Sequence, residues 1–159
     1  MDSQPPEAPG SPPSITAATW RDLLNVRQLE RVCFPRDAWP LLDVIGVLTL
    51  PNVIRLKATL NGLVVGFIAA DVRTRQDLAW VATIGVLPEF RRGGIGSALL
   101  RVCEERLTVG RLRLSVRASN RAALALYERF QFRQVEVWPR YYHDGEDALV
   151  LEKLAHRVR

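Results

Sequence analysis

The amino-acid sequence predicts an α/β domain in which one mixed β-sheet packs against about four helices. The first observation behind this prediction is the stretch 81–100, VATIGVLPEFRRGGIGSALL. Its β-branched apolar run ends at a glycine-rich turn, and a helical apolar pattern follows. The second is that strand-like and helix-like patterns follow the order β-α-α-β-β-β-α-β-α-β-β. The third is the length of 159 residues, which suits one domain with a sizeable core.

The N-terminal part of the chain predicts a tail, a strand and two helices. Residues 1–14 contain five prolines and little that could pack, so we expect a disordered tail. Thr19 is a suitable N-cap for a helix whose apolar residues recur at helical spacing. The predicted elements are a strand at 15–17, a helix that runs from this cap to Phe34-Pro35, and a second helix at 41–50 that ends at Pro51.

The middle and the C-terminal part predict six more strands and two helices. Asn61-Gly62 is a strong signal for a two-residue hairpin turn. The run after it is almost entirely apolar, which is typical of a strand buried on both faces. The predicted elements are strands at 53–60, 64–72 and 78–87, a helix from Ile95 that ends at Gly110, a strand at 112–116, a helix at 121–129 capped by Ser119 or Asn120, strands at 132–138 and 148–154, and a C-terminal tail at 155–159.

Composition restricts the class of protein. The net charge is +5 and the pI is near 9.9, but the arginines are scattered along the chain, so we expect no nucleic-acid partner. No apolar run approaches the roughly 18 residues of a membrane span, and no signal peptide is recognisable, so we expect no membrane partner and a cytoplasmic location. Cys33 and Cys103 are expected to be buried thiols, and two histidines form no metal-binding pattern.

The turn between the strand and the helix at 81–100 predicts an anion site. Backbone N–H groups in the first turn of a helix have no intrahelical partners, and Gly93, Gly94 and Gly96 let an anion approach them closely. Arg91 and Arg92 add positive charge at the same place. The P-loop lysine and the G-x-G-x-x-G spacing of dinucleotide-binding folds are both missing. An ordinary glycine-rich turn with two solvated arginines is the alternative.

Further stretches identify a family resemblance. The pattern Arg91-x-x-Gly94-x-Gly96 resembles motif A of the GCN5-related N-acetyltransferases (GNAT), and the element order matches theirs. LSVRASNRAALALYERF, WPRYYHDGEDALVLEKL and Phe34-Pro35 resemble segments of the RimI-like protein N-terminal acetyltransferases. The resemblance covers roughly residues 15–154 and implies one N-acetyltransferase domain. It also implies a seven-stranded, mostly antiparallel sheet whose parallel fourth and fifth strands splay apart.

The resemblance implies acetyl-coenzyme A (acetyl-CoA) as co-substrate, with no metal, and direct attack of an amine on the thioester. The N–H of Val86 is then an oxyanion donor, and Tyr127 is the general acid for the departing thiolate. The alternatives are that Tyr127 is a core aromatic and that Asn120 only caps its helix. The implied coenzyme-binding residues are Ile84, Val86, Arg91, Arg92, Gly93, Gly94, Ile95, Gly96, Ser97, Asn120 and Tyr127.

One departure from the family concerns the general base. RimI-like enzymes often carry glutamate or histidine where Ser115 stands here, and related eukaryotic enzymes use a tyrosine where Trp80 stands. Neither residue is a strong base, so Ser115 is expected to act only by holding a water, together with Thr83 or backbone carbonyls. A chain α-amine has a pKa of about 7.7–8.0 against about 10.4 for lysine, so a site without a strong base suits an α-amine.

The expected acceptor is therefore a protein or peptide N-terminus. Aromatic and proline surfaces suit an extended peptide, and we expect five residues to form the acceptor site: Phe34, Pro35, Trp39, Tyr141 and Tyr142. The alternatives are an enzyme that acetylates a small-molecule amine and a non-catalytic acyl-CoA-binding module. A monomer and a homodimer are both compatible with the sequence.

Overall fold

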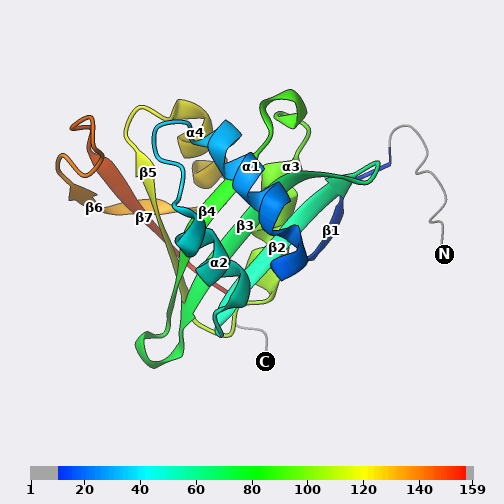
Figure 1. The fold of residues 1–159 in the computed structure, drawn as a ribbon. Helices are drawn as coiled ribbons and strands as arrows, with labels where there is room; N and C mark the ends of the chain where they lie inside the picture. Colours follow the sequence, from blue (N-terminus) through cyan, green and yellow to red (C-terminus); the bar gives the residue numbers. More distant parts are fainter. Residues whose placement is uncertain (1–10, 157–159) are drawn as a thin grey trace.

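The computed structural model describes residues 11–156 and shows a seven-stranded sheet with helices on both faces (Figure 1). The sheet order is β1-β2-β3-β4-β5-β7-β6, and only the β4–β5 pair is parallel. The strands are β1 Ser14–Ala17, β2 Val53–Leu60, β3 Leu63–Arg73, β4 Leu78–Val86, β5 Arg111–Arg117, β6 Arg133–Trp138 and β7 Ala148–Leu154. The helices are α1 Leu23–Cys33, α2 Leu41–Thr49, α3 Ile95–Glu105 and α4 Arg121–Arg129.

The predicted sheet and helices are confirmed, with most bounds within one residue. There are two exceptions. Thr19 caps a 3-10 turn at Trp20–Asp22, so α1 begins only at Leu23, and α3 ends at Glu105 and not at Gly110. Leu107 and Val109 are buried, so the apolar pattern continues in an irregular segment after the helix has ended. β1 begins at Ser14, one residue inside the predicted tail. Residues 1–10 and 157–159 lie outside the described residues, so disorder in the two tails stays a prediction.

The sheet separates two apolar clusters. Phe67 and Ala69 of β3 face α1 and α2, where they pack with Val26, Leu29 and Val44. The alternate β3 residues face the larger cluster on the side of α3, which includes Leu99 and Leu100. In Figure 1, α1 and α2 lie in front of the sheet and α3 lies behind it. β3 is therefore buried on both faces, as its apolar sequence predicts. Among the described residues, none of the helices is long and apolar enough to span a membrane.

Two irregularities of β4 create the site. β4 and β5 pair only from Leu78–Trp80 with Arg111–Arg113, and beyond that point they separate, which is the splay that the family resemblance implies. β4 also carries a bulge, because Thr83 pairs with Ala69 while Val81 pairs with Ala70, so Ala82 is an extra residue. The side chains before and after the bulge therefore alternate with opposite phase.

Candidate active site

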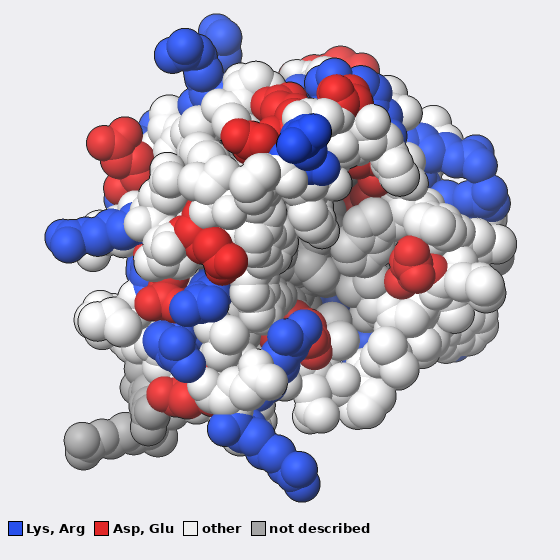
Figure 2. All heavy atoms as spheres, turned by 90° about the vertical axis from the view of Figure 1, so that its left-hand side faces the viewer, with Lys and Arg blue, Asp and Glu red and all other residues white. Residues whose placement is uncertain are grey.

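Two connected cavities lie around the separated ends of β4 and β5. The larger has a volume of about 960 Å³ and the smaller about 310 Å³. Tyr127, Ile84 and Asn120 are among the residues that line both, so the cavities meet there. Figure 2 shows one face of the molecule, hollowed at its centre and lined there mainly by side chains without charge; acidic and basic side chains are interspersed around the hollow.

The larger cavity is lined by the glycine-rich turn. Gly94 is the N-cap of α3 and has a left-handed φ of 79°, and Arg92 also has a positive φ of 67°. The helix N-terminus therefore points its free N–H groups toward the cavity. Gly93 belongs to the same turn but does not line the cavity. The predicted coenzyme-binding residues in its wall are Ile84, Val86, Arg91, Arg92, Gly94, Ile95, Gly96, Ser97, Asn120 and Tyr127.

The C-terminal end of β4 forms another part of this wall. The carbonyl oxygen of Val86 accepts a hydrogen bond from Arg91 Nε at 3.0 Å and a weak one from Cys33 Sγ at 3.3 Å. The first of these bonds holds the Arg91 side chain against the end of β4. Burial raises the pKa of the Cys33 thiol, so this thiol stays protonated as a donor at neutral pH.

Tyr127 and Asn120 are placed by α4. Asn120 is the N-cap of α4, and its Oδ1 accepts a hydrogen bond from the N–H of Ala123 at 3.2 Å. The ring of Tyr127 packs edge-on against Phe132, with 5.6 Å between the centroids. Burial raises the pKa of the Tyr127 hydroxyl, so it keeps its proton well above neutral pH. Tyr127 is thus both a buried aromatic and a residue in the wall of both cavities.

The smaller cavity brings together most of the predicted acceptor residues. Four predicted residues line it from two loops, α1–α2 and β6–β7: Phe34, Trp39, Tyr141 and Tyr142. Ser115 of β5 lines the same cavity, whereas Pro35 lines the larger one. Trp80 lies outside both linings and stacks on Trp138 at a centroid distance of 5.7 Å. The indole of Trp80 offers only an N–H donor, so it cannot act as the base that the family resemblance assigns to a tyrosine at that place.

Arg117 of β5 ties the loops around this cavity together. Its guanidinium makes ion pairs of 2.9 Å with Asp37 of the α1–α2 loop, and with Asp144 and Glu146 of the β6–β7 loop. It also lies 4.0 Å from the ring centroid of Tyr142. Hydrogen bonds to these acids raise the pKa of Arg117. The bonds to Asp37 have the largest effect, and those to Glu146 and Asp144 add to it. One half-buried cation thus ties together the two loops that carry the aromatic walls, and its partner Asp37 lies 80 residues away in the chain.

We expect Arg117→Ala to loosen the loops 34–40 and 139–147 and to lower catalytic efficiency with the acceptor at least tenfold. Charged partners left unpaired cost about 1.5–3 kcal/mol per hydrogen bond, which corresponds to roughly tenfold or more. Hydrogen exchange of both loops measures the effect. The matched control is Arg113→Ala, which removes an arginine of the same strand whose partner is Glu152 on β7. Equal protection of the loops in both variants would contradict this role.

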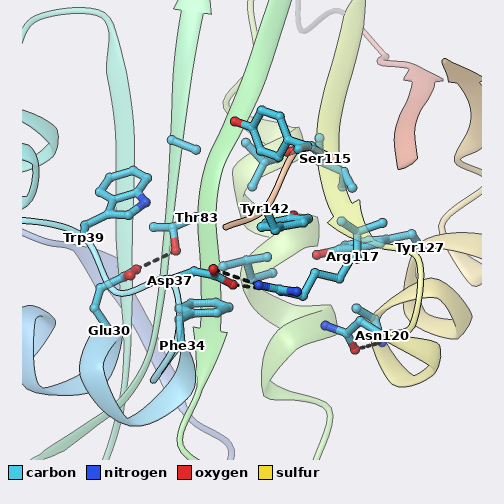
Figure 3. Close-up of a pocket in the computed structure, with 17 residues that line it drawn as sticks. Glu30, Phe34, Asp37, Trp39, Thr83, Ser115, Arg117, Asn120, Tyr127 and Tyr142 are labelled. Carbon is cyan, nitrogen blue, oxygen red and sulfur yellow. Dashed lines mark hydrogen bonds and ion pairs between the residues drawn. The ribbon is translucent and has the colours of Figure 1, made fainter. Parts of the chain in front are cut away.

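Glu30 is a site residue that the sequence prediction missed. It lies on α1 at a position where the other residues of the helical stripe, Val26 and Leu29, are apolar and buried. Glu30 is itself only 2% exposed, and its Oε1 accepts a hydrogen bond of 2.5 Å from the hydroxyl of Thr83 on β4 (Figure 3). The sequence feature that could have revealed Glu30 is its position as a lone acid on the apolar face of an amphipathic helix. Among the described residues, no group of three or more potential ligands is placed to hold a metal.

Sequence comparisons place these features in a known family. The model of the acetyltransferase (GNAT) family matches residues 21–132. The N-alpha-acetyltransferase RimI of Mycobacterium tuberculosis is 35% identical over 146 residues, which cover 89% of this chain and 92% of that protein. An N-alpha-acetyltransferase of Sulfurisphaera tokodaii is 30% identical over 151 residues, with 86% and 90% covered.

Solved structures agree with this assignment. The ribosomal-protein-S18-alanine N-acetyltransferase of Escherichia coli superposes with a TM-score of 0.81 at 29% identity, covering 92% of this chain and 96% of that chain. NAA60 of Arabidopsis thaliana in complex with acetyl-CoA has the same fold, with a TM-score of 0.77, 20% identity, and 89% and 98% covered. The chain belongs to the GNAT acetyltransferase family, and it is an acetyl-CoA-dependent N-acetyltransferase of the RimI-like type.

Proposed function

We propose that this enzyme transfers the acetyl group to the α-amine of a protein or peptide N-terminus. The observation that carries the proposal is the chemistry of the smaller cavity, whose walls combine several aromatic side chains with small apolar ones. An N-terminal residue can pack its side chain on such walls while its backbone is hydrogen-bonded at the rim. The relatives named N-alpha-acetyltransferase support the same acceptor class.

The acidic groups at this cavity favour a peptide over a polyamine. A polycationic acceptor needs several free carboxylates, but Asp37, Asp144 and Glu146 are all engaged by Arg117. Among the residues that line the cavity, this leaves Glu30 as a single carboxylate without an ion pair, which suits one amine and not a polycation. Asp144 is also paired with Arg36 at 3.0 Å, and Glu146 accepts from the N–H of Ser119 at 2.7 Å. Releasing any of them for a ligand would break charge-assisted hydrogen bonds.

The residue roles follow from the wall that each residue lines. Backbone N–H groups from Arg92 to Ser97 hold the pyrophosphate at the N-terminus of α3, where the helix dipole favours an anion. Backbone groups of Ile84 and Val86 bond the pantetheine arm in the gap between the splayed strands. The Val86 N–H stabilises the charge that develops on the thioester oxygen, and Tyr127 protonates the thiolate. Asn120 bonds the arm in addition to capping α4, and Ser115 holds a water.

We expect peptides with a free α-amine to be acetylated at that amine, and α-blocked peptides that contain lysine to be poor acceptors. At neutral pH, roughly a tenth of α-amines are uncharged, against well under a thousandth of lysine amines. Mass spectrometry of matched blocked and unblocked peptides measures the site and the rate. Equal turnover of the two peptides, or efficient turnover of small amines alone, would instead assign the enzyme to small-molecule amines.

We also expect Tyr141→Ala and Tyr142→Ala to raise the KM for the peptide several-fold more than the KM for acetyl-CoA. Both rings line the smaller cavity but not the larger one, and a lost aromatic contact costs about 0.5–1.5 kcal/mol. Steady-state kinetics with each substrate varied in turn measure the two constants. His143→Ala is the matched control, since His143 is exposed in the same loop and lines neither cavity. A larger change in the KM for acetyl-CoA would contradict the proposed acceptor site.

A further inference from the structure

Glu30 has an environment that stability does not explain. Its Oε2 is buried and accepts no hydrogen bond from the described residues, while Oε1 is bonded to Thr83. None of the ion pairs of the described residues involves Glu30, and Arg117, the cation that lines the same cavity, is engaged by three other acids. A buried carboxylate without a cation destabilises the fold relative to an apolar residue of similar size. Its presence therefore requires another reason.

The backbone directs this carboxylate into the site. Ala79 and Val81 of β4 pack in the cluster on the α3 side, and after the bulge Ile84 and Val86 pack there instead. The extra residue at Ala82 thus turns Thr83 to the opposite face, toward α1, where its hydroxyl meets Glu30.

Glu30 and Thr83 both line the smaller cavity, together with Ser115 and Tyr127. In Figure 3, Glu30 and Tyr127 lie on opposite sides of the view, with Thr83 between them. A proton acceptor and a proton donor are thus available on two sides of one cavity. This arrangement fits an acetyl transfer, in which the amine must lose protons and the thiolate must gain one.

We propose that the carboxylate of Glu30, positioned by Thr83, accepts the proton of the acceptor's ammonium group, and so supplies the base that is missing at Ser115. The inference rests on the proposed function for the class of amine. The ammonium group gives one proton to Glu30, directly or through a water; the neutral nitrogen then forms the N–C bond as the C–S bond breaks. Tyr127 gives its proton to the thiolate and recovers one from the former amine, and Glu30 releases its proton to solvent.

The electrostatics of the cavity support this role. Burial raises the pKa of Glu30, while the Thr83 hydroxyl and the nearby N–H of Trp39 lower it without cancelling that effect. The other titratable groups around the cavity are Asp37, Arg117, Tyr127, Tyr141 and Tyr142, and Cys33 lies one turn further along α1. A carboxylate with a pKa closer to that of an α-amine is a better proton acceptor for it than an ordinary one.

The test is Glu30→Gln assayed with two peptides that differ only at the N-terminus. One carries an ordinary α-amine, and the other an aminooxy group, which is already uncharged at neutral pH. Glutamine keeps the size of the side chain and can still accept from Thr83. We expect kcat at pH 7 to fall about 10²-fold or more with the α-amine peptide and less than about tenfold with the aminooxy peptide. The acidic limb of the wild-type pH–kcat profile, where the rate falls as Glu30 becomes protonated, should disappear.

Controls separate this role from a structural one. We expect the melting temperature of Glu30→Gln to be equal to or higher than that of the wild type, because an unpaired buried charge is removed. Asp22→Asn is the matched control: Asp22 is a buried acid just before α1, paired with Lys57 at 2.7 Å and outside both cavities. Its loss should lower stability and leave kcat near the wild-type value. Thr83→Ser should retain more activity than Thr83→Val.

Two results would overturn the proposal: a kcat of Glu30→Gln within about threefold of the wild type, or an equal loss with both peptides. Failure of the proposed function is visible separately, in the wild-type enzyme. If the wild type acetylates only lysine side chains or small amines, the α-amine assignment is wrong. The same Glu30→Gln comparison, made with that amine and its aminooxy analogue, then decides the role of Glu30.

Discussion

Gly96→Glu is expected to abolish acetyl-CoA binding while the protein remains folded. A Cβ at position 96 lies 3.5 Å from Leu126 Cδ2 and 3.9 Å from Val86 Cγ2, which are ordinary contacts, so the backbone accepts a side chain. The rest of the glutamate side chain must then enter the larger cavity, which Gly96 lines, and place a negative charge at the proposed pyrophosphate site. Two lost charge-assisted hydrogen bonds, at about 1.5–3 kcal/mol each, correspond to roughly 10²–10⁴-fold weaker binding.

Isothermal calorimetry with acetyl-CoA measures this loss, and thermal unfolding checks that the variant is folded. Gly96→Ala is the matched control, because its Cβ fits the same space and carries no charge. We expect it to bind with an affinity between those of the wild type and Gly96→Glu. A folded Gly96→Glu protein with undiminished affinity would show that the pyrophosphate is held elsewhere.

Tyr127→Phe is expected to lower kcat by about 10²–10⁴-fold, the usual contribution of a general acid. The substitution keeps the ring that packs against Phe132 and removes only the hydroxyl. Because burial raises the pKa of this hydroxyl, it stays protonated as a donor throughout the pH range of an ordinary assay. Little change is expected in the melting temperature or in the affinity for acetyl-CoA.

Release of free thiol under saturating substrates measures kcat in this variant. The matched control is Tyr141→Phe, since Tyr141 is 56% exposed and its hydroxyl has no assigned part in proton transfer. Wild-type turnover in Tyr127→Phe would show that Tyr127 is only a core aromatic. Solvent would then protonate the thiolate.

Local patterns in the sequence determined most of the fold. The turn at Asn61-Gly62 adopts the two positive φ values, 48° and 78°, that its residue types favour. The helix at 121–129 begins after its Asn120 cap and ends where its pattern ends. The glycine-rich turn within 81–100 can be predicted from its residue types alone, because positive φ and free N–H groups are local properties. For this reason the family and the coenzyme could be predicted as well.

Only the tertiary structure decided how the acceptor side is built. Glu30 and Thr83 are 53 residues apart, and Arg36 and Asp144 are 108 apart, so no local pattern relates them. The bulge at Ala82 changes the face of the sheet on which Thr83 lies. The apolar run of β4 does not predict this bulge, because its residue types suit a regular strand equally well. The family resemblance places the general base at the position of Ser115, on β5. The fold instead brings a buried carboxylate to the same cavity from α1, because a site is assembled by side chains that meet in space, whichever segments carry them.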